Sequence, residues 1–187
     1  FEMMIKRHRG EITMEKLGNV NPIVIGSTPS TKENKYWENG THTWVSVREL
    51  NNSTIPITNS VKKLTDTAIS ECNPHLVKKS SILMSFKLSI GKMGIAGCDL
   101  YTNEAIVHIN TNNELSNKWL YYYYLCYPPI GASGCIGGGN LNKDKLKNIE
   151  FINMPNNIKS KIVQTLDDLE AEKNKITEIL QQLDTEM

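Results

Sequence analysis

The chain has 187 residues, which suits one globular domain of ordinary size with a modest extension. Hydrophobic residues make up 39% of it and charged residues 22%, as in a soluble protein with a packed core, and no apolar run approaches the roughly 20 residues that cross a bilayer. The net charge of +1 conceals an asymmetry, because residues 1–155 hold 17 Lys and Arg against 13 Asp and Glu, whereas residues 156–187 hold 4 against 7. A basic head followed by an acidic tail favours a polyanion-binding domain with a separate assembly element.

The first half of the chain predicts short strands separated by polar loops. Residues 21–26 form a largely apolar run closed by a glycine, and the β-branched and aromatic stretch at residues 43–47 predicts a second strand. A polar loop at residues 27–32 and an Asn39-Gly40 turn lie between them. Further along, the polar stretch at residues 58–69 is expected to end in a short helix.

The second half adds more strands and two short helices. The predicted strands are residues 80–86, 90–96, 104–109 and 149–152, and the predicted helices are residues 117–127 and 142–147. Pro128-Pro129 ends the first of these helices, and a flexible loop with five glycines follows at residues 131–142. Short strands mixed with small helices predict one α+β domain over residues 1–155 rather than a series of βαβ units.

Residues 156–187 are predicted to form one long helix with an apolar stripe. From Asn157 onward there is no proline or glycine, and the stripe positions alternate at spacings of four and three, the pattern of a coiled coil. These positions are Ile162, Leu166, Leu169, Lys173, Ile176, Leu180, Leu183 and Met187. A helix of this length extends for about 45 Å, and an apolar stripe in water must pack on another helix. We therefore expect a coiled-coil dimerisation and spacer helix; the alternative is a helix folded back onto its own domain.

The sequence contains no recognisable motif for catalysis or metal binding. The cysteines, at positions 72, 98, 126 and 135, include no close pair that could hold a metal, so we expect reduced thiols in a cytoplasmic protein. Tyr127-Pro128-Pro129-Ile130 has the wrong outer residues for the motif with which DNA methyltransferases grip a flipped base, and Gly137-Gly138-Gly139 lacks the Gly-Lys-Ser/Thr of a phosphate loop. The carboxylates do not cluster as a metal-dependent nuclease requires. We expect a non-catalytic chain that binds no cofactor or metal of its own.

Several loop residues have the chemistry that DNA binding requires. Basic side chains neutralise phosphates, and polar side chains on loops reach the edges of bases. The candidates are Thr28, Ser30, Lys32, Arg48, Lys62, Lys63, Lys87 and Lys92, with Lys78 and Lys79 as further donors. Tyr36, Trp37 and the run Tyr121–Tyr124 are candidates for stacking on bases, whereas Trp44 and Trp119 are expected in the core.

The order of these segments resembles the recognition domains of type I restriction–modification specificity subunits. The opening of that family's domain is similar to Leu17-Gly18-Asn19-Val20, Gly26-Ser27-Thr28-Pro29-Ser30, Tyr36-Trp37, Gly40 and Trp44 to Leu50. Its central glycine-bearing strands are similar to residues 85–106, its closing segment to residues 139–155, and its long conserved helix to the striped helix. The helix start at residues 162–167 follows the family pattern, but the Pro-Leu-X-Glu-Gln that usually precedes it is missing. The contacts at the start of the helix are therefore not predicted by the resemblance.

What the resemblance implies is recognition rather than catalysis. The family has two recognition domains joined by two antiparallel helices, so this chain would be a half-subunit or a fragment. It would recognise one half of a split target in double-stranded DNA, dock methyltransferase and possibly restriction subunits, and form a homodimer through its helix. S-adenosylmethionine, ATP and magnesium would belong to those partner subunits. Two alternatives stay open: the recognition domain of a single-chain type II restriction–methylation enzyme, and a coiled-coil adaptor whose head binds a protein or a saccharide.

Overall fold

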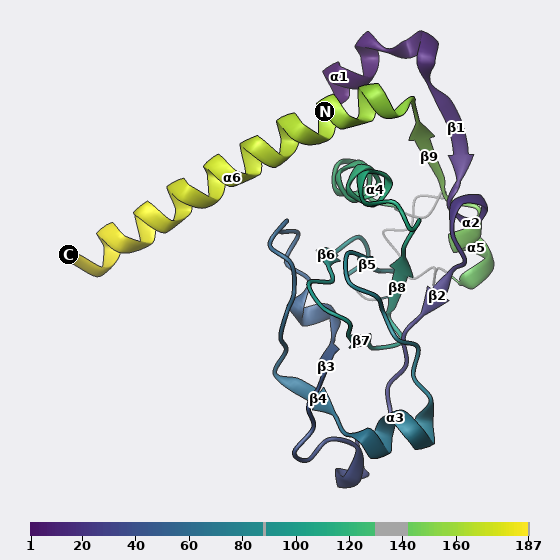
Figure 1. Cartoon of the computed structure of the whole chain (residues 1–187), viewed down its shortest axis with the longest axis vertical. Helices are drawn as coiled ribbons and strands as arrows, with labels where there is room; N and C mark the ends of the chain where they lie inside the picture. Colours follow the sequence, from purple (N-terminus) through teal and green to yellow (C-terminus); the bar gives the residue numbers. More distant parts are fainter. Residues whose placement is uncertain (88, 130–141, 187) are drawn as a thin grey trace.

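The computed structural model describes residues 1–87, 89–129 and 142–186, with the side chains of the last helix described as far as Asp184. The strands in chain order are β1 Thr13–Lys16, β2 Val24–Ile25, β3 His42–Val45, β4 Lys62–Leu64, β5 Ile82–Ser85, β6 Met93–Ile95, β7 Tyr101–Thr102, β8 Ile106–Ile109 and β9 Glu150–Asn153. The helices are α1 Glu2–Arg7, α2 Leu17–Val20, α3 Asp66–Cys72, α4 Glu114–Cys126, α5 Lys143–Lys147 and α6 Asn156–Glu186, with 3-10 turns η1 Arg9–Glu11, η2 Asn34–Tyr36 and η3 Val47–Glu49. The expected α+β domain with a long C-terminal helix is confirmed (Figure 1).

The central sheet has the order β2-β8-β5-β6, and its neighbouring strands are antiparallel. Both faces of this sheet are covered, since every residue of β5 and β8 is buried. Side chains alternate between the faces of a strand, so Ile82 and Met84 pack into the main core whereas Leu83 packs into a second cluster with Val45 and Leu100. The sheet therefore joins two parts of the head that have separate cores.

α4 covers one face of the central sheet and is buried nearly all round. It contacts β5, β6, β9 and α6. Its four consecutive tyrosines, residues 121–124, are all buried, so the interpretation that they stack on bases is wrong. Trp119 of the same helix is also buried, as expected, and its indole Nε1–H donates to the Ile152 carbonyl at 2.7 Å. The helix is covered on several sides because elements from both ends of the chain meet around it.

A smaller sheet with the order β4-β3-β7 forms the other part of the head. β3 pairs antiparallel with β4 and parallel with β7. Trp44, Leu64, Ala68 and Tyr101 form a small buried cluster between this sheet and α3, and the burial of Trp44 confirms the expectation for that residue. β4 lies in a stretch that the sequence indicated only as polar, because two of its three residues are lysines. The pairing with β3 is a long-range contact that residue propensity does not express.

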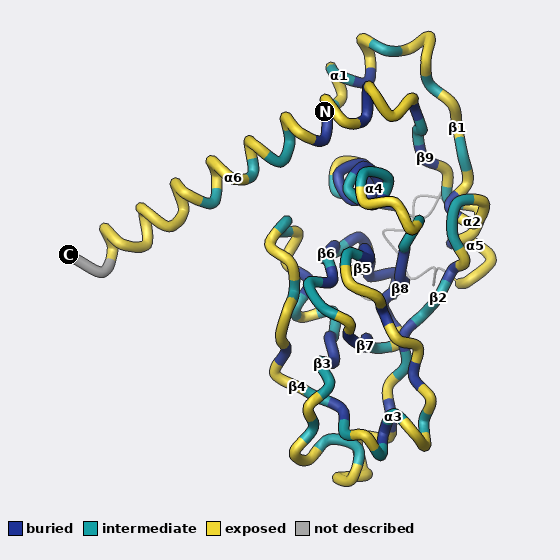
Figure 2. Tube along the Cα trace, in the orientation of Figure 1, coloured by how far each residue is buried: buried dark blue, intermediate teal, exposed yellow. Residues whose placement is uncertain are grey.

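α6 begins inside the head and then leaves it. Ile158, Ile162 and Val163 belong to the main core, and Leu166 packs against it. Beyond this point the helix projects away from the head as a rod, and most of its surface is exposed (Figures 1 and 2). The expected stripe therefore divides at about Leu166: Ile162 packs within its own domain, and the part open to a partner begins at Leu169. Met187, the last stripe position, lies outside the described residues.

Two further sequence features also lie outside the described residues. These are most of the glycine-rich loop expected at residues 131–142, including the Gly137–Gly139 run and Cys135, and the first part of the segment that resembles the family's closing motif. In the described part of the chain, no helix is both long and apolar enough to cross a membrane.

Candidate nucleic-acid interface

Two tryptophans hold the polar loop that precedes η2. The Trp37 Nε1–H donates to the Ser30 carbonyl at 3.0 Å, and the Trp44 Nε1–H donates to the Ser27 carbonyl at 3.2 Å. The two indole rings meet edge to face with their centroids 5.0 Å apart. Because Trp44 is buried in the small sheet, the loop is anchored to the core of the head. A loop held in this way presents its polar side chains in a defined position.

The turn that precedes β3 and a hydrogen-bonded serine that precedes β4 fix the lysines of β4. Asn39 has a φ of 58°, and a Cβ on the adjacent Gly40 would lie 2.4 Å from the Lys63 carbonyl oxygen, so only glycine allows this approach. Just before β4, the Ser60 hydroxyl accepts from the Trp44 backbone N–H at 3.0 Å and donates to the Lys62 carbonyl at 2.6 Å. The start of β4 is therefore hydrogen-bonded even at the edge of its sheet.

A cleft of about 270 Å³ lies between the anchored loop and β4. Its lining residues are Thr31, Asn34, Trp37, Val61, Lys62 and Lys63. The Lys62 ammonium lies 5.3 Å from the centroid of the Trp37 ring and 6.0 Å from that of Trp44, a cation–π arrangement that restricts where the charge can be. A lysine placed in advance loses less conformational freedom when it contacts an anion than a freely moving one does. This basic cleft, defined by its six lining residues, is the candidate site.

The acidic side chains of the adjoining helix α3 are paired within the head. The Lys35 ammonium lies 2.6 Å from the Glu71 carboxylate, to which the Tyr36 hydroxyl donates at 2.9 Å. The Lys35 hydrogen bond, followed by that of Tyr36, lowers the pKa of Glu71. His42 Nε2 lies 2.7 Å from an Asp66 carboxylate oxygen. Glu71 therefore stays ionised with its charge balanced by Lys35.

Only some of the predicted DNA-binding residues line the basic cleft. Lys62 and Lys63 line the basic cleft, and Lys32 is exposed next to a lining residue in sequence. Thr28 instead donates a hydrogen bond to Glu104, and the Ser30 carbonyl holds Trp37. Their contact with DNA stays a prediction.

The remaining candidates lie on other segments. Arg48 is exposed on η3, which begins with a capping box between Ser46 and Glu49. Lys87 and Lys92 lie in the connection between β5 and β6, and the Lys87 ammonium is 5.4 Å from the centroid of the Phe86 ring. Lys78, one of the further donors, is paired with Asp99 at 2.8 Å. These residues do not line the basic cleft.

The sequence interpretation missed two kinds of residue in the cleft. Thr31 and Asn34 lie one and two residues from the predicted contact Lys32, but nothing in their pattern separates them from ordinary polar loop residues. Val61 offered a better signal, since it is a β-branched residue between a polar run and two lysines. In the structure its side chain is 95% exposed.

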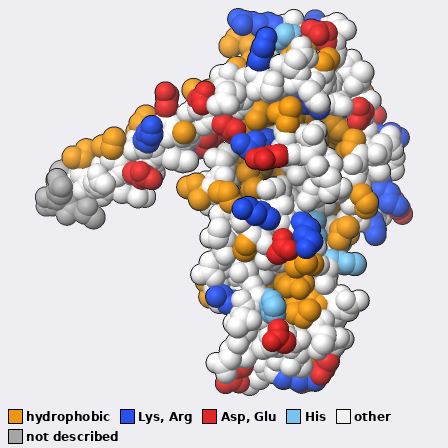
Figure 3. Space-filling view, viewed as in Figure 1, with side chains coloured by type: hydrophobic (Ala, Val, Ile, Leu, Met, Phe, Trp, Pro, Cys, Tyr) orange, Lys and Arg blue, Asp and Glu red, His pale blue; other side chains and the backbone are white. Residues whose placement is uncertain are grey.

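The second candidate binding surface is the apolar stripe of α6. Leu169, Ile176, Leu180 and Leu183 are 52–58% exposed, and hydrophobic side chains run along one edge of the rod in Figure 3. The Lys173 ammonium, which interrupts the stripe, lies 3.3 Å from the Glu170 carboxylate one turn earlier. The charge within the stripe therefore has a partner on the same helix.

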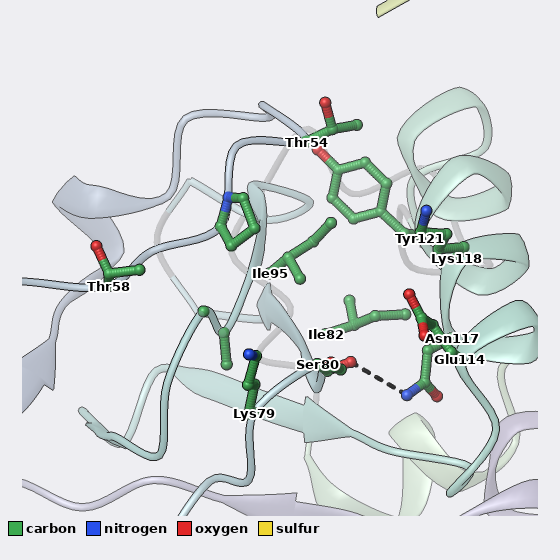
Figure 4. Close-up of a pocket in the computed structure, with 13 residues that line it drawn as sticks. Thr54, Thr58, Lys79, Ser80, Ile82, Ile95, Glu114, Asn117, Lys118 and Tyr121 are labelled. Atoms are coloured by element: carbon green, nitrogen blue, oxygen red, sulfur yellow. Dashed lines mark hydrogen bonds between the residues drawn. The ribbon is translucent and has the colours of Figure 1, made fainter. Parts of the chain in front are cut away.

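Two adjoining cavities lie where α6 leaves the head. One, of about 410 Å³, is lined by residues 54–58, the central sheet and α4, and Asn117 at its wall donates to the Ser80 carbonyl at 3.1 Å (Figure 4). The other, of about 290 Å³, shares Lys118 and Tyr121 with the first and reaches α6. Among the described residues, none hydrogen-bonds to the buried Tyr121 hydroxyl. The second cavity therefore leaves a gap between α4 and the part of α6 that contains Asp167, Ala171 and Asn174.

No group of three or more His, Cys, Asp or Glu side chains that could hold a metal ion occurs among the residues that the structure describes. The Pro128-Pro129 pair directly follows the end of α4 at Cys126 and Tyr127, in agreement with its interpretation as a helix stop.

Taken together, the fold and these two surfaces define a binding head carried on a helical arm. The sequence profile of the type I restriction modification DNA specificity domain matches residues 10–184, which is nearly the whole chain. The chain therefore belongs to that family.

Curated relatives and solved structures agree with this assignment. The chain is 29% identical over 182 residues to the type I restriction enzyme MjaIX specificity subunit of Methanocaldococcus jannaschii, a match that covers 93% of the chain and 42% of the relative. It is 24% identical over 191 residues to the EcoR124I/EcoR124II specificity subunit of Escherichia coli, with 95% and 45% covered. The chain thus spans less than half the length of these relatives.

The solved structures share the fold. A chain from a structural study of complex assembly in the type I R-M system superimposes with a TM-score of 0.69 at 15% identity, covering 99% of this chain and 47% of that one. The HsdS subunit from Thermoanaerobacter tengcongensis gives a TM-score of 0.66 at 17% identity, with 90% and 40% covered. Both matches include most of this chain, so the chain shares its fold with these structures.

Proposed function

We propose that this chain is a non-catalytic DNA-recognition module of a type I restriction–modification system, which recognises one half of a split target. The observation that carries the proposal is the match to the DNA specificity family over residues 10–184, which takes in both the head and α6. The specificity subunits that it resembles are about twice its length. One head and one arm are therefore proposed to supply half of the recognition that a full-length subunit supplies.

The head is proposed to bind double-stranded DNA through the basic cleft. Lys62 and Lys63 offer positive charge to phosphates, and Thr31 and Asn34 offer hydrogen-bonding groups on an anchored loop. The ion pair that balances Glu71 of α3 reduces repulsion of the DNA backbone from this side. This arrangement supports a contact surface in which phosphate contacts position the head and loop side chains meet the bases.

The arm is proposed to pair with a second long helix and to set the distance between two heads. Its 31 residues correspond to about 46 Å of α-helix. The stripe from Leu169 to Leu183 is half-exposed, and pairing it with another helix removes apolar surface from water. A second copy of this chain can supply that helix in a symmetric pair.

The remaining activities of such a system are proposed to lie in partner subunits. Methyltransferase subunits, and possibly restriction subunits, would dock on the assembled module and carry S-adenosylmethionine, ATP and magnesium. The reaction itself would then occur in the cytoplasm on DNA that the module has selected.

Salt-dependent DNA binding tests the head. The purified chain is expected to bind duplex oligonucleotides, with an affinity that falls steeply as salt rises, because phosphate contacts release counterions. Lys62→Ala should lower the slope of log affinity against log salt by about one. Lys143→Ala, on the distant helix α5, is the control and should leave that slope unchanged. A chain that ignores duplex DNA at low salt would instead favour the adaptor alternative.

Light scattering tests the arm. Leu180→Asp places a charge in the open stripe and is expected to shift the protein from dimer to monomer while the head stays folded. Lys175→Asp adds negative charge to the same helix outside the stripe positions, and this control should leave the mass unchanged. If wild-type protein is monomeric at tens of micromolar, self-pairing through α6 is wrong.

A further inference from the structure

Val61 is an apolar residue whose side chain is almost fully exposed to water. Its side chain is 95% exposed, compared with 59% for Ile55, another exposed apolar residue of the head. Burial of an aliphatic side chain is favourable, so a valine that stands fully in water gains no stability from its apolar character. The fold therefore gives no structural reason for an apolar residue here.

The backbone that carries Val61 is held in place from both sides. The preceding Ser60 is buried, and its hydroxyl connects the Trp44 N–H to the Lys62 carbonyl. The following residue, Lys62, pairs with Trp44 in the β3–β4 register and extends its ammonium over the indole rings. Val61 is thus an exposed apolar group on an ordered support, unlike one at the tip of a loose loop.

The surroundings of Val61 favour nucleic acid over a protein partner. The other residues that line the cleft are Trp37, two lysines, a threonine and an asparagine. A protein-binding surface usually centres on a contiguous apolar patch with few charges, whereas this valine stands beside two cations. In the DNA major groove, phosphates lie close to the thymine C5 methyl, which is an apolar group that proteins recognise by apolar contact.

We propose that Val61 determines specificity by contacting the C5 methyl of a thymine in the major groove. This inference rests on the proposed function of the head and adds to it a particular residue and a particular base. In this arrangement, Lys62 and Lys63 contact phosphates on either side of the thymine. Val61 then lies against the C5 methyl of that thymine in the major groove. The contact distinguishes thymine from the other bases by shape and apolar character, without a hydrogen bond.

The test removes the methyl group from the DNA and the side chain from the protein in turn. A preferred duplex is first selected from a randomised pool with the wild-type chain, and each thymine in it is then replaced singly by deoxyuridine. At one position the replacement should weaken wild-type binding about fourfold, which corresponds to about 0.8 kcal/mol for one buried methyl-sized group. Val61→Ser should bind the two duplexes with less than a twofold difference at that position.

Control variants and outcomes separate this inference from the proposed function. Ile55→Ser removes another exposed apolar side chain of the head and should retain the fourfold effect. If the wild-type chain selects a duplex but no deoxyuridine replacement weakens binding, or if the effect persists in Val61→Ser, the role of Val61 is wrong and DNA recognition stands. If the chain selects no duplex, both fail. A Val61→Ser variant that keeps the methyl effect but loses assembly with an added methyltransferase subunit would assign Val61 to a protein contact.

Discussion

At the scale of single residues, the head uses aromatic side chains to position polar ones. The Trp37 and Trp44 indoles donate to backbone carbonyls of the polar loop, and the faces of their rings lie near the Lys62 ammonium. A tryptophan suits both tasks because it combines a large apolar surface with one N–H donor and a ring that attracts cations. The same residues therefore stabilise the small sheet and organise the basic cleft.

His108 makes the stability of the head depend on pH. It lies buried in β8, where its Nε2 is 2.5 Å from the Thr102 hydroxyl oxygen, and burial together with the charge of His75 lowers its pKa to about 4. Because this value is below the 6.5 of an unfolded histidine, the unfolded state binds a proton that the folded state does not between about pH 6.5 and 4. The contribution of His108 to stability is therefore complete above pH 6.5 and is lost as the pH falls.

We expect the wild-type chain to lose about 1.6 kcal/mol of unfolding free energy through His108 between pH 6.5 and pH 5. Urea denaturation at the two pH values measures the loss. His108→Gln cannot titrate and should show a loss smaller by that amount. Equal losses in wild type and His108→Gln would contradict the assignment.

At the scale of elements, the direction of α6 is set by its contact with α4. The Asp167 carboxylate accepts from the Lys118 ammonium and from the Tyr122 hydroxyl, each at 2.7 Å. Burial, followed by the Asp167 hydrogen bond, raises the pKa of Tyr122, so its hydroxyl stays protonated and remains a donor. One carboxylate of the arm is thus bound by two side chains of the head at the point where the helix leaves it.

Replacing this carboxylate should weaken the joint. Asp167→Ala leaves the Lys118 and Tyr122 groups without their acceptor, and because the site is only partly buried we expect a loss of about 1–2 kcal/mol in unfolding free energy. Chemical denaturation followed by tyrosine and tryptophan fluorescence measures it. Asp168→Ala, which removes only an exposed contact with Gln164, should cost less than about 0.5 kcal/mol. Similar losses in the two variants would show that Asp167 does not join the elements.

At the scale of the whole molecule, the head and the arm are built as one piece. The first turns of α6 contribute Ile158, Ile162 and Val163 to the main core of the head, and α1 adds Ile5 to the same cluster. A rod that begins inside a packed core transmits the position of whatever pairs with its far end. This continuity is what the proposed spacing role requires, because a flexible joint would let the two heads move independently.

Lengthening the arm should therefore lengthen the spacer in the DNA target. Repeating residues 176–182 after residue 182 preserves the stripe and adds about 10.5 Å to the helix. This length corresponds to about three base pairs at 3.4 Å per base pair. Target selection from randomised duplexes should return the same half-sites with a spacer longer by that number. An insertion of five residues after residue 172 turns the rest of the stripe out of line and should abolish pairing. An unchanged spacer with the seven-residue insertion would contradict the proposed spacing role.

The local patterns of the sequence were sufficient for several elements. The strands β5 and β8, the helix α4 with Trp119 in the core, and the length of α6 all follow from apolar runs, periodicity and helix-stopping prolines. Neighbouring residues encode these features, because the periodicity of apolar side chains and the residues that end a helix are both recognisable within a short stretch of sequence. The resemblance that led to the family also depended on the order of such segments.

Long-range packing decided the rest, because contacts between distant segments are not encoded in any local pattern. It buried the tyrosines of α4 that were candidates for base stacking, took Ile162 from the expected stripe into the core, and paired β4 with β3. It also selected Lys62 and Lys63 from many exposed lysines by bringing them to the anchored loop. The sequence by itself therefore determined a basic α+β head with a striped helix, and the tertiary structure decided which side chains face a partner, since burial depends on what the rest of the chain places beside them.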